Sequence, residues 1–349
     1  MTDETAFAST RPGIRLAGQE RADMQDALTA MVVTLPLNGM AHAELHLGNF
    51  GTRPDGRGIG FLFDDIALGA EIELAMGGDG GVTVFKGEIT ALEERYGDGA
   101  PKLVLLLQDK LHRLARERRS RVFDDQSLDE VVRAVANDAG LRADVDASSV
   151  AATYHQLNES DLAFLLRLLW PLDVALRLDG DTLRARPEQP DPEPIRIDSQ
   201  DNALRARLIA DLNHQADSTR VLGFNAGNDQ AVAASARALP SAPAGTTAAR
   251  LLGRLGWPGA EVVPQPFARS QGEADAFAAG HFKRQAKRFI SGDIRILGEP
   301  RLRSGREIEL TGVSERLRGT YQVVHCVHRF DNSSGYETQL RVNRPDWNG

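Results

Sequence analysis

The chain has 349 residues, of which 42% are hydrophobic and 26% are charged, a composition typical of a globular protein with two or three domains. The formal net charge of −8 argues against a dedicated nucleic-acid-binding protein, because phosphate contacts normally need a basic face. The sequence has no apolar run as long as a membrane span and no signal-like N-terminus, and its single cysteine, Cys326, excludes an intrachain disulfide framework.

The residues from 12 to 118 are predicted to form a first β domain. Two strands are expected within residues 29–47, and in the second strand Ala43, Leu45 and Leu47 alternate with polar residues. The following segment, NFGTRPDGRGIGF at 49–61, is rich in Gly, Asp, Arg and Pro and is predicted to be an exposed loop. Its glycines resemble a phosphate-binding pattern only superficially, since no strand-to-helix context surrounds them.

A basic run, KLHRLARERRSR from Lys110 to Arg121, leads out of the first β domain. We interpret it as a solvated connector helix, with contact to a partner as the alternative, because runs of charge usually face solvent. No aromatic residue is interleaved with these charges, so a single-stranded nucleic-acid site is not expected.

The residues from 119 to 192 are predicted to form a small α/β module. Ser127 and Glu130 have capping-box spacing and Gly140 suits a left-handed C-cap, which together predict a helix between them. A second helix is expected to start near Asn158 and to stop at Pro171. The apolar stripe of the first helix and that of the second are Leu128, Val131, Val132 and Val135, and Leu162, Leu165, Leu166 and Leu169.

The module is predicted to close with a hairpin and a linker. Residues 174–186 fold back on Asp179-Gly180, a dipeptide typical of a tight hairpin turn. The inward-facing positions of this hairpin are expected to be Val174, Leu176, Leu178, Leu183 and Ala185. The sequence EQPDPEP at 188–194 then indicates an extended linker.

The residues from 193 to 349 are predicted to form a second β domain that contains one helix. Strands are expected near 203–213 and 219–227, followed by a mobile loop, SAPAGTTA, at 241–248. The helix is expected at about 273–290, and a final β unit closes the domain.

The final unit reads like a second copy of an earlier one. Glu71–Gln108 and Glu307–Arg344 both begin EIEL, at an offset of 236, and each copy reads as strand, long hairpin arm, Gly-containing turn and return strand. At that single offset the aligned pairs are Phe85 with Tyr321, Val84 with Thr320, Ala91 with Val327, and Val104 with Leu340. We therefore predict an α+β, mainly β fold, in which two similar tube-forming antiparallel β-barrel domains flank a small α/β module. Such a chain can build a ring whose apparent symmetry is twice its number of subunits.

Three stretches resemble the phage late control protein D family, the baseplate hubs of contractile-tailed phages, and the N-terminal part of the VgrG spike proteins of type VI secretion. Tyr154–Leu169 is similar to the family's acidic segment that opens a Leu-rich helix, and Arg121–Leu141 to the Ser-capped helix before it. Leu317–Pro345 is similar to the terminal segment. Its matching features are Gly319, Tyr321, His328, Gly335, Tyr336 and Thr338.

The resemblance implies a structural baseplate hub in a phage tail, tailocin or related particle. Three subunits would close a ring of six similar domains and adapt a sixfold tail tube to a threefold spike. The implied partners are two further copies of the chain, the tube protein and a separately encoded spike, with tape measure and baseplate wedge proteins as further candidates. We expect synthesis in the bacterial cytoplasm, and no specific nucleic-acid binding. The sequence after Arg344 is also expected to leave no room for the neck and needle of VgrG proteins.

A metal site at His325-Cys326-Val327-His328 is an alternative interpretation of the last unit. On a strand Cys326 and His328 point together while His325 points away, and two ligands leave a tetrahedral site half empty. We therefore predict a structural role, with His328 hydrogen-bonded near the strand end, and we expect no catalytic, cofactor-binding or metal-binding residues.

Two other function classes remain as alternatives. A peptidoglycan-degrading tail enzyme would need paired carboxylates, and Glu71 with Glu73 or Glu93 with Glu94 are available, but strand alternation explains the first pair as a solvent face. A receptor-binding or glycan-binding tail module would need a stacking surface, and the chain is only 6% aromatic with three scattered tryptophans.

Overall fold

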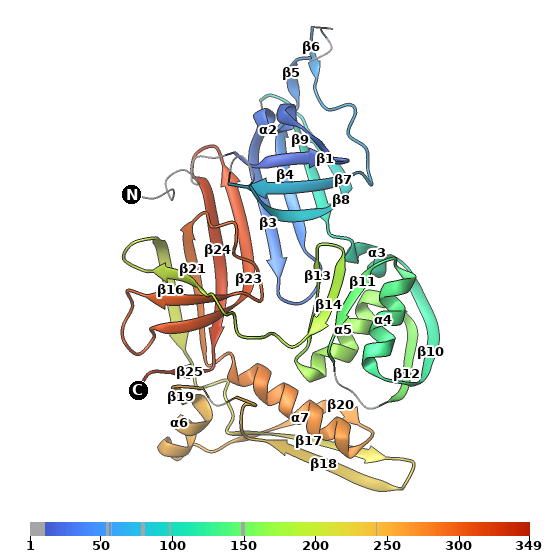
Figure 1. The fold of residues 1–349 in the computed structure, drawn as a ribbon, viewed down its shortest axis with the longest axis vertical. Coiled ribbons are helices and arrows are strands. Elements are labelled where there is room, and N and C mark those ends of the chain that lie inside the picture. Colours follow the sequence, from blue (N-terminus) through green and yellow to red (C-terminus); the bar gives the residue numbers. More distant parts are fainter. Residues whose placement is uncertain are drawn as a thin grey trace.

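The computed structural model describes residues 11–349 except 54, 55, 57, 78–80, 98, 148–150 and 242. Half of the chain lies in strands and 18% in helices, and the strands build large antiparallel sheets, so the predicted mainly β class is confirmed. Figure 1 shows the first β domain at the top in blue and cyan, the green α/β module beside it, and the second β domain in olive and red at the left. Among the described residues, no helix is both long enough and apolar enough to cross a lipid bilayer.

The first β domain rests on long strands whose alternate residues point inward. Ala43, Leu45 and Leu47 are buried, as their alternation predicts, and Met31 and Val33 of the neighbouring strand face the same core. The elements of this domain are β1 (Gly13–Leu16), β2 (Gln19–Glu20), α2 (Ala22–Ala27), β3 (Leu28–Pro36), β4 (His42–Gly48), β5 (Phe50–Thr52), β6 (Ile59–Phe61), β7 (Glu71–Met76), β8 (Val82–Arg95) and β9 (Lys102–Gln108).

A projecting hairpin replaces part of the loop expected at residues 49–61. β5 pairs with β6, and the opposed rings of Phe50 and Phe61 lie 5.7 Å apart, edge to face. An aromatic cross-strand pair stabilises such a ribbon even in Gly-rich surroundings, which is why the loop prediction was wrong at its ends. The hairpin extends beyond the rest of the domain (Figure 1), and the predicted tip residues 54, 55 and 57 lie outside the described residues.

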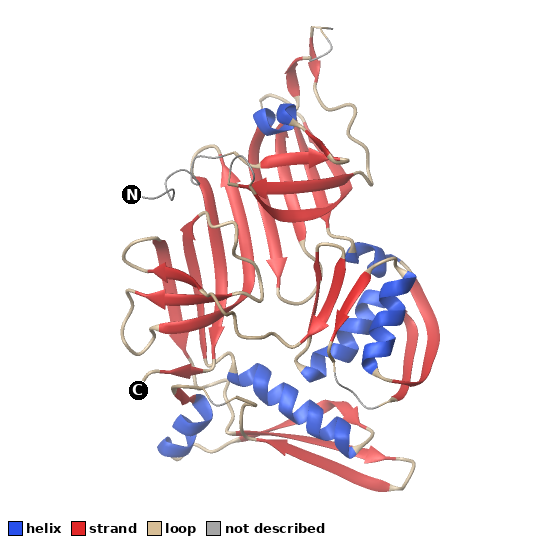
Figure 2. Ribbon diagram, in the orientation of Figure 1, coloured by secondary structure: helices blue, strands red, loops and turns tan. Residues whose placement is uncertain are grey.

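The α/β module packs two helices between short sheets (Figure 2). Its first predicted helix is confirmed, because the Ser127 hydroxyl accepts from the Glu130 amide and the Glu130 carboxylate accepts from the Ser127 amide at 2.7 Å. The hairpin at Asp179-Gly180 is confirmed as well. The elements are α3 (Leu111–Arg116), β10 (Arg118–Gln126), α4 (Leu128–Asp138), β11 (Arg142–Val145), β12 (Ala152–Ser160), α5 (Asp161–Leu169), the 3₁₀ turn η1 (Trp170–Leu172), β13 (Ala175–Asp179) and β14 (Thr182–Arg186).

Two helix predictions need correction in this module. Only the first half of the basic run 110–121 is helical, because the chain from Arg118 onward pairs with β12 as strand β10. The second helix begins at Asp161 rather than near Asn158, since the preceding residues belong to β12 and Ser160 supplies the N-cap. Asp161 is buried and accepts hydrogen bonds from Arg121 of β10 and from Gln156 of β12, both at 2.8 Å, so this carboxylate joins the two strands to the helix.

The second β domain repeats the architecture of the first and carries an inserted layer. Its main strands are β15 (Ile195–Asp198), β16 (Ala203–Ala210), β21 (Ile290–Leu297), β22 (Glu307–Thr311), β23 (Gly319–Asp331) and β24 (Gly335–Arg344). The inserted layer contains β17 (Ser218–Asn225), β18 (Gln230–Ala236), β19 (Thr246–Thr247), α6 (Ala248–Leu255), β20 (Ala260–Ala268), α7 (Gln271–Ala286) and, from the chain end, β25 (Asp346–Trp347). Residues 246–248 of the expected mobile loop are therefore ordered, because Thr247 caps α6 and pairs with Asp346.

The predicted repeat is present, although a single offset does not describe it. Gly69 donates its amide to the Ile89 carbonyl at 2.8 Å, and Gly305 donates to the Val323 carbonyl at the same distance. The offset is therefore 236 for the turns, from 69 to 305, but 234 for the long strand, from 89 to 323. The loops between strands differ in length, so the single-offset pairs were wrong. The structural counterparts of Phe85, Val84, Ala91 and Val104 are Gly319, Arg318, His325 and Gln339.

Irregularities of the strands recur at the same places. β8 has a register shift between Ile89 and Ala91, and β23 has one between Val323 and His325, again 234 residues later. β-bulges are specific local features, so their coincidence shows that the two strands are equivalent in detail.

The repeat extends to two strands that sequence comparison did not reach. β3 shifts register between Leu28 and Ala30 against β4, and β16 shifts between Ala203 and Arg205 against β21. The shift in β16 lies 175 residues after the shift in β3. β16 is therefore the counterpart of β3, and β21 is the counterpart of β4. Each β domain therefore contains the same five-stranded unit.

The two units are joined by direct strand pairing. The first half of β23 pairs with β22, whereas His325–Asp331 pairs antiparallel with β3 of the first domain. Phe330 stands opposite Met31 and is buried in the first domain's core. Within the part of the chain that the structure describes, one sheet of 13 strands consequently runs through both domains.

Helix α7 packs closely on the module, and this contact requires glycine. A Cβ added at Gly280 would lie 2.3 Å from the Pro171 carbonyl oxygen, whereas a Cβ at Gly253 in α6 would meet nothing within 4 Å. We expect Gly280→Ala to lower the free energy of unfolding by about 1–3 kcal/mol because backbone must shift. The matched change Gly253→Ala should be neutral or stabilising by up to about 1 kcal/mol, because alanine favours a helix. Chemical denaturation measures both, and equal effects of the two changes would contradict the assigned contact.

Candidate functional site

In the row formed by the two five-stranded units, one strand edge at each end lacks a partner among the described residues. β8 pairs with β7 through its first half and with β9 through its second half, so Ala91–Arg95 has one open side, which we call the β8 edge. β16 pairs with β21 alone, and the other side of Ala203–Ala210 is the β16 edge. Exposed edges invite pairing with another chain unless charges or cover prevent it. The two edges are therefore candidate assembly surfaces.

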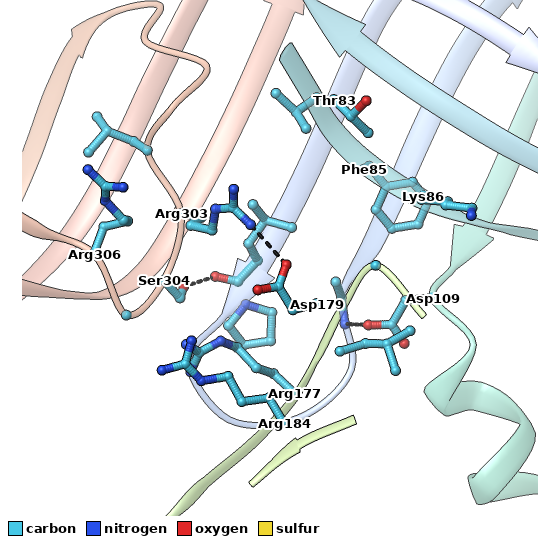
Figure 3. A pocket seen from close by; sticks show the side chains of 18 of the residues that line it. Thr83, Phe85, Lys86, Asp109, Arg177, Asp179, Arg184, Arg303, Ser304 and Arg306 are labelled. Atoms are coloured by element: carbon cyan, nitrogen blue, oxygen red, sulfur yellow. Dashed lines mark hydrogen bonds and ion pairs between the residues drawn. The ribbon is translucent and has the colours of Figure 1, made fainter. Parts of the chain in front are cut away.

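A cavity of about 740 Å³ lies where the two β domains meet the β13–β14 hairpin. Figure 3 shows that its labelled side chains come from all three parts, with Phe85 and Lys86 from the first domain and Arg303 and Arg306 from the second. Arg303 donates to Asp179 of the hairpin at 3.0 Å, and the Ser304 hydroxyl donates to the Leu35 carbonyl. The cavity is thus crossed by bonds that hold the domains together.

Two other arginines that line the cavity are paired with carboxylates. Arg177 pairs with Glu188 at 3.1 Å, and Arg306 forms an ion pair with Asp191 at 2.6 Å. Lys110 is not a lining residue, but it also bridges the first domain and the module, through Glu71 and Asp181. These pairs suit a domain junction rather than a reaction centre, which needs groups poised to exchange protons with a substrate.

Asp109 is the buried carboxylate at this junction. It accepts hydrogen bonds from the amides of Ala41 at 2.8 Å and Leu111 at 3.0 Å, and so ties the β3–β4 loop to the start of α3. Burial raises the pKa of Asp109 to about 6, although both hydrogen bonds favour the charged form. Burial of this charge is unfavourable, and the two hydrogen bonds to backbone amides partly offset the unfavourable free energy.

Glu88 forms a second link between β8 and α3. Its carboxylate lies 2.7 Å from His112 Nε2 and accepts from Arg113 Nε at 3.1 Å. Burial alone would raise the pKa of Glu88, but the hydrogen bonds from Arg113 and His112 outweigh it and keep the pKa below its ordinary value.

The segment His325-Cys326-Val327-His328 is divided between the two faces of β23, as strand alternation predicts. Cys326 and His328 are buried together, and His328 is hydrogen-bonded within the core. Its Nδ1 accepts from the Tyr336 hydroxyl at 2.8 Å and its Nε2 donates to the Leu302 carbonyl at 3.0 Å. Burial lowers the pKa of His328 to about 4, so both nitrogens are committed to a neutral structural role. In the described part of the chain, no three potential ligands cluster as a metal site.

The paired carboxylates considered for catalysis are held by separate partners. Glu71 lies 3.0 Å from Lys110, and Glu93 accepts from Arg95 at 2.8 Å. Glu94 accepts from the Tyr96 hydroxyl on the other face of β8, and Glu73 accepts from Thr83. Glycoside hydrolysis requires two carboxylates that face each other across a bond, and this arrangement does not provide them.

A largely apolar hollow of about 800 Å³ separates the module from the inserted layer. Arg284 lies 4.3 Å from the centre of the Trp170 ring, and Arg269 donates to the Thr153 carbonyl at 2.7 Å. These bonds fix α7 and β20 against the module. Sequence reasoning missed this contact because its partners are more than 100 residues apart and carry no shared motif.

The raised pKa of Asp109 makes a specific pH prediction. The folded state binds this proton more tightly than the unfolded chain does. The contribution of Asp109 to the free energy of unfolding should therefore fall as the pH rises from about 4 to about 6. Relative to the wild type, Asp109→Asn should therefore gain about 3 kcal/mol over that range, measured by chemical denaturation at each pH.

The control is Asp331→Asn. Hydrogen bonds from Ser333 and Ser334 lower the pKa of Asp331 to about 2, so its removal should give no such gain above pH 4. A difference between Asp109→Asn and the wild type that does not change with pH would contradict a buried, pKa-raised carboxylate.

A family model described as the Alg8 N-terminal domain matches residues 63–332 of the chain. No curated protein sequence matches this chain. Several solved structures have the same fold as this chain at low sequence identity. Such a likeness is evidence for the fold and not for an activity.

Three of these structures are tail or secretion proteins. The 43 kDa tail protein of prophage MuSo2 from Shewanella oneidensis has a TM-score of 0.73 at 14% identity, over 96% of this chain and 98% of that one. A tail protein from Neisseria meningitidis MC58 has a TM-score of 0.65 at 11% identity, over 96% of both chains. The E. coli protein c3393, a component of the type VI secretion system described as structurally similar to the T4 tail proteins gp27 and gp5, has a TM-score of 0.58 at 12% identity, over 91% of this chain and 73% of that one.

Proposed function

This chain belongs to the Alg8 N-terminal domain family, and we propose that it is the structural baseplate hub of a contractile injection system such as a phage tail or tailocin. The family description names no reaction. The proposal is supported by the fold, which phage tail proteins share over nearly the whole length of both chains. The sequence resemblance to late control protein D hubs supports the same proposal.

The observation that carries the proposal is the pairing of β23 with β3. It joins two equivalent five-stranded units within one chain and leaves the β8 edge and the β16 edge open at the two ends. A contact between different surfaces generates a ring if the rotation closes and a filament if it does not. Three copies would close a ring of six equivalent β units with only threefold true symmetry.

Such a ring matches the geometry of a hub. Its six β units would face a sixfold tail tube, while the modules and inserted layers, one per chain, would present a threefold surface to a separate spike. The chain then acts as an adaptor rather than an enzyme, and its buried charges serve its domain junctions.

The first test is the mass of the assembly. We expect native mass spectrometry to find a trimer, either for the chain alone at high concentration or together with co-expressed tube and spike proteins, because partner binding populates weak assemblies. Electron microscopy of the co-purified complex should place the trimer between tube and spike. A chain that stays monomeric in every one of these preparations would refute the hub proposal.

A second test concerns nucleic acid. A conduit should not hold its cargo, and a chain with a net charge of −8 should bind duplex DNA only weakly and with strong salt dependence. Fluorescence anisotropy in physiological salt should show no submicromolar affinity. Tight binding that persists in this buffer would contradict a passive hub.

A further inference from the structure

We propose that the β8 edge of one copy pairs antiparallel with the β16 edge of a second copy, in a register that the chain itself displays. This inference rests on the proposed hub function and specifies the surface that closes the ring. The template is the internal joint, where β23, the counterpart of β8, pairs with β3, the counterpart of β16. The same two strand types therefore meet inside the chain and remain free at its ends.

The register follows from the recurring bulges. Residues of β8 map to β23 at an offset of 234, and residues of β3 map to β16 at an offset of 175. Val327 stands opposite Thr34 in the internal joint. Its counterparts, Glu93 and Ile209, should then stand opposite each other between copies. The neighbouring pairs are Leu92 with Ala210, Glu94 with Leu208, Arg95 with Arg207, and Tyr96 with Ala206.

Exposed apolar groups at the β8 edge fit a covered interface. Tyr96 is 59% exposed, whereas its counterpart Phe330 is 5% exposed because the internal joint buries it. Leu92 is also exposed, and the Tyr96 ring lies 6.2 Å from Phe61 of the projecting hairpin. This apolar surface continues directly from the open backbone, as a strand-addition site requires.

Charge on the two edges is complementary. The β8 edge carries the adjacent carboxylates Glu93 and Glu94, and the β16 edge carries Arg205 and Arg207. In the proposed register Glu93 is diagonal to Arg207, within reach of a cross-strand ion pair. Arg95 would stand opposite Arg207 in this register. Glu93, which already accepts from Arg95 at 2.8 Å, would then be next to both guanidinium groups and would offset their repulsion.

Disulfide trapping tests the register in the full chain. The double variant Glu93→Cys with Ile209→Cys should form covalent trimers on mild oxidation, because opposed residues of antiparallel strands have Cα atoms about 5 Å apart. The matched control is Glu93→Cys with Arg205→Cys, whose second cysteine lies on the same strand and face but about 13 Å along it. At least about tenfold less covalent product is expected there, since a disulfide needs Cα atoms within about 7 Å. The native Cys326 is fully buried and is controlled by oxidising the wild type.

The outcomes separate this inference from the hub proposal. A trimer by native mass without trapping of Glu93→Cys to Ile209→Cys would overturn the edge pairing and leave the hub proposal standing. A covalent ladder that continues past three chains would support the edge pairing and contradict the closed ring. Trapping only to a tube or spike protein would overturn the edge pairing.

Two further measurements, one on the wild-type chain and one on single substitutions, test the same strand pairing. Hydrogen exchange should slow in residues 91–97 and 203–210 together when the trimer forms, and exchange that is unchanged in both segments would overturn the inference. Tyr96→Ser should weaken trimer formation by roughly tenfold or more while leaving the monomer melting temperature unchanged, because its apolar area is buried only between copies. Phe224→Ser, a comparable exposed aromatic on β17, is the control that should not change trimer formation.

Discussion

The structure depends on one contact, the pairing of β23 with β3. A β unit with two edges cannot satisfy all of its backbone groups alone, and an exposed edge is a template for further pairing. In this chain two such units satisfy one edge each by pairing with each other, and side chains such as Phe330 cross the joint into the neighbouring core. A row of two units has two ends, so the β8 edge and the β16 edge remain unpaired within one chain.

The rest of the chain can be understood as support for that joint. Asp109 and Glu88 anchor the module to the first domain, while Arg303 and Arg306 link the second domain to the hairpin and the linker. Helix α7 then binds the inserted layer to the module through close contact at Gly280. The carboxylates of Glu88 and Asp191 are buried, and breaking a buried ion pair costs more than the pair contributes to net stability. These pairs therefore favour one relative placement of the domains.

The sequence predicted the parts of the fold that local patterns control. Alternation in residues 42–48, the capping box at Ser127 and the turn at Asp179-Gly180 each describe a local preference that tertiary packing did not override. The repeat was also visible, because EIEL recurs before two long hairpin arms. Its register was not, since two loops differ in length and a fixed offset cannot absorb the change. Two predictions were wrong, a helix over the whole basic run at 110–121 and a helix start near Asn158. The reason is that β10 and β12 pair although they are far apart in sequence, which no local pattern reveals.

The candidate assembly site was beyond reach of the sequence for a related reason. β3 and β16 share bulge position and neighbours but almost no residue identities, so only hydrogen bonding reveals them as equivalent. Electron cryomicroscopy of the assembled oligomer tests the central claim most directly. We predict one closed sheet in which internal β23–β3 joints alternate with β8–β16 joints and Glu93 faces Ile209 of the next copy. An oligomer in which the β8 edge and the β16 edge both face solvent would contradict the account.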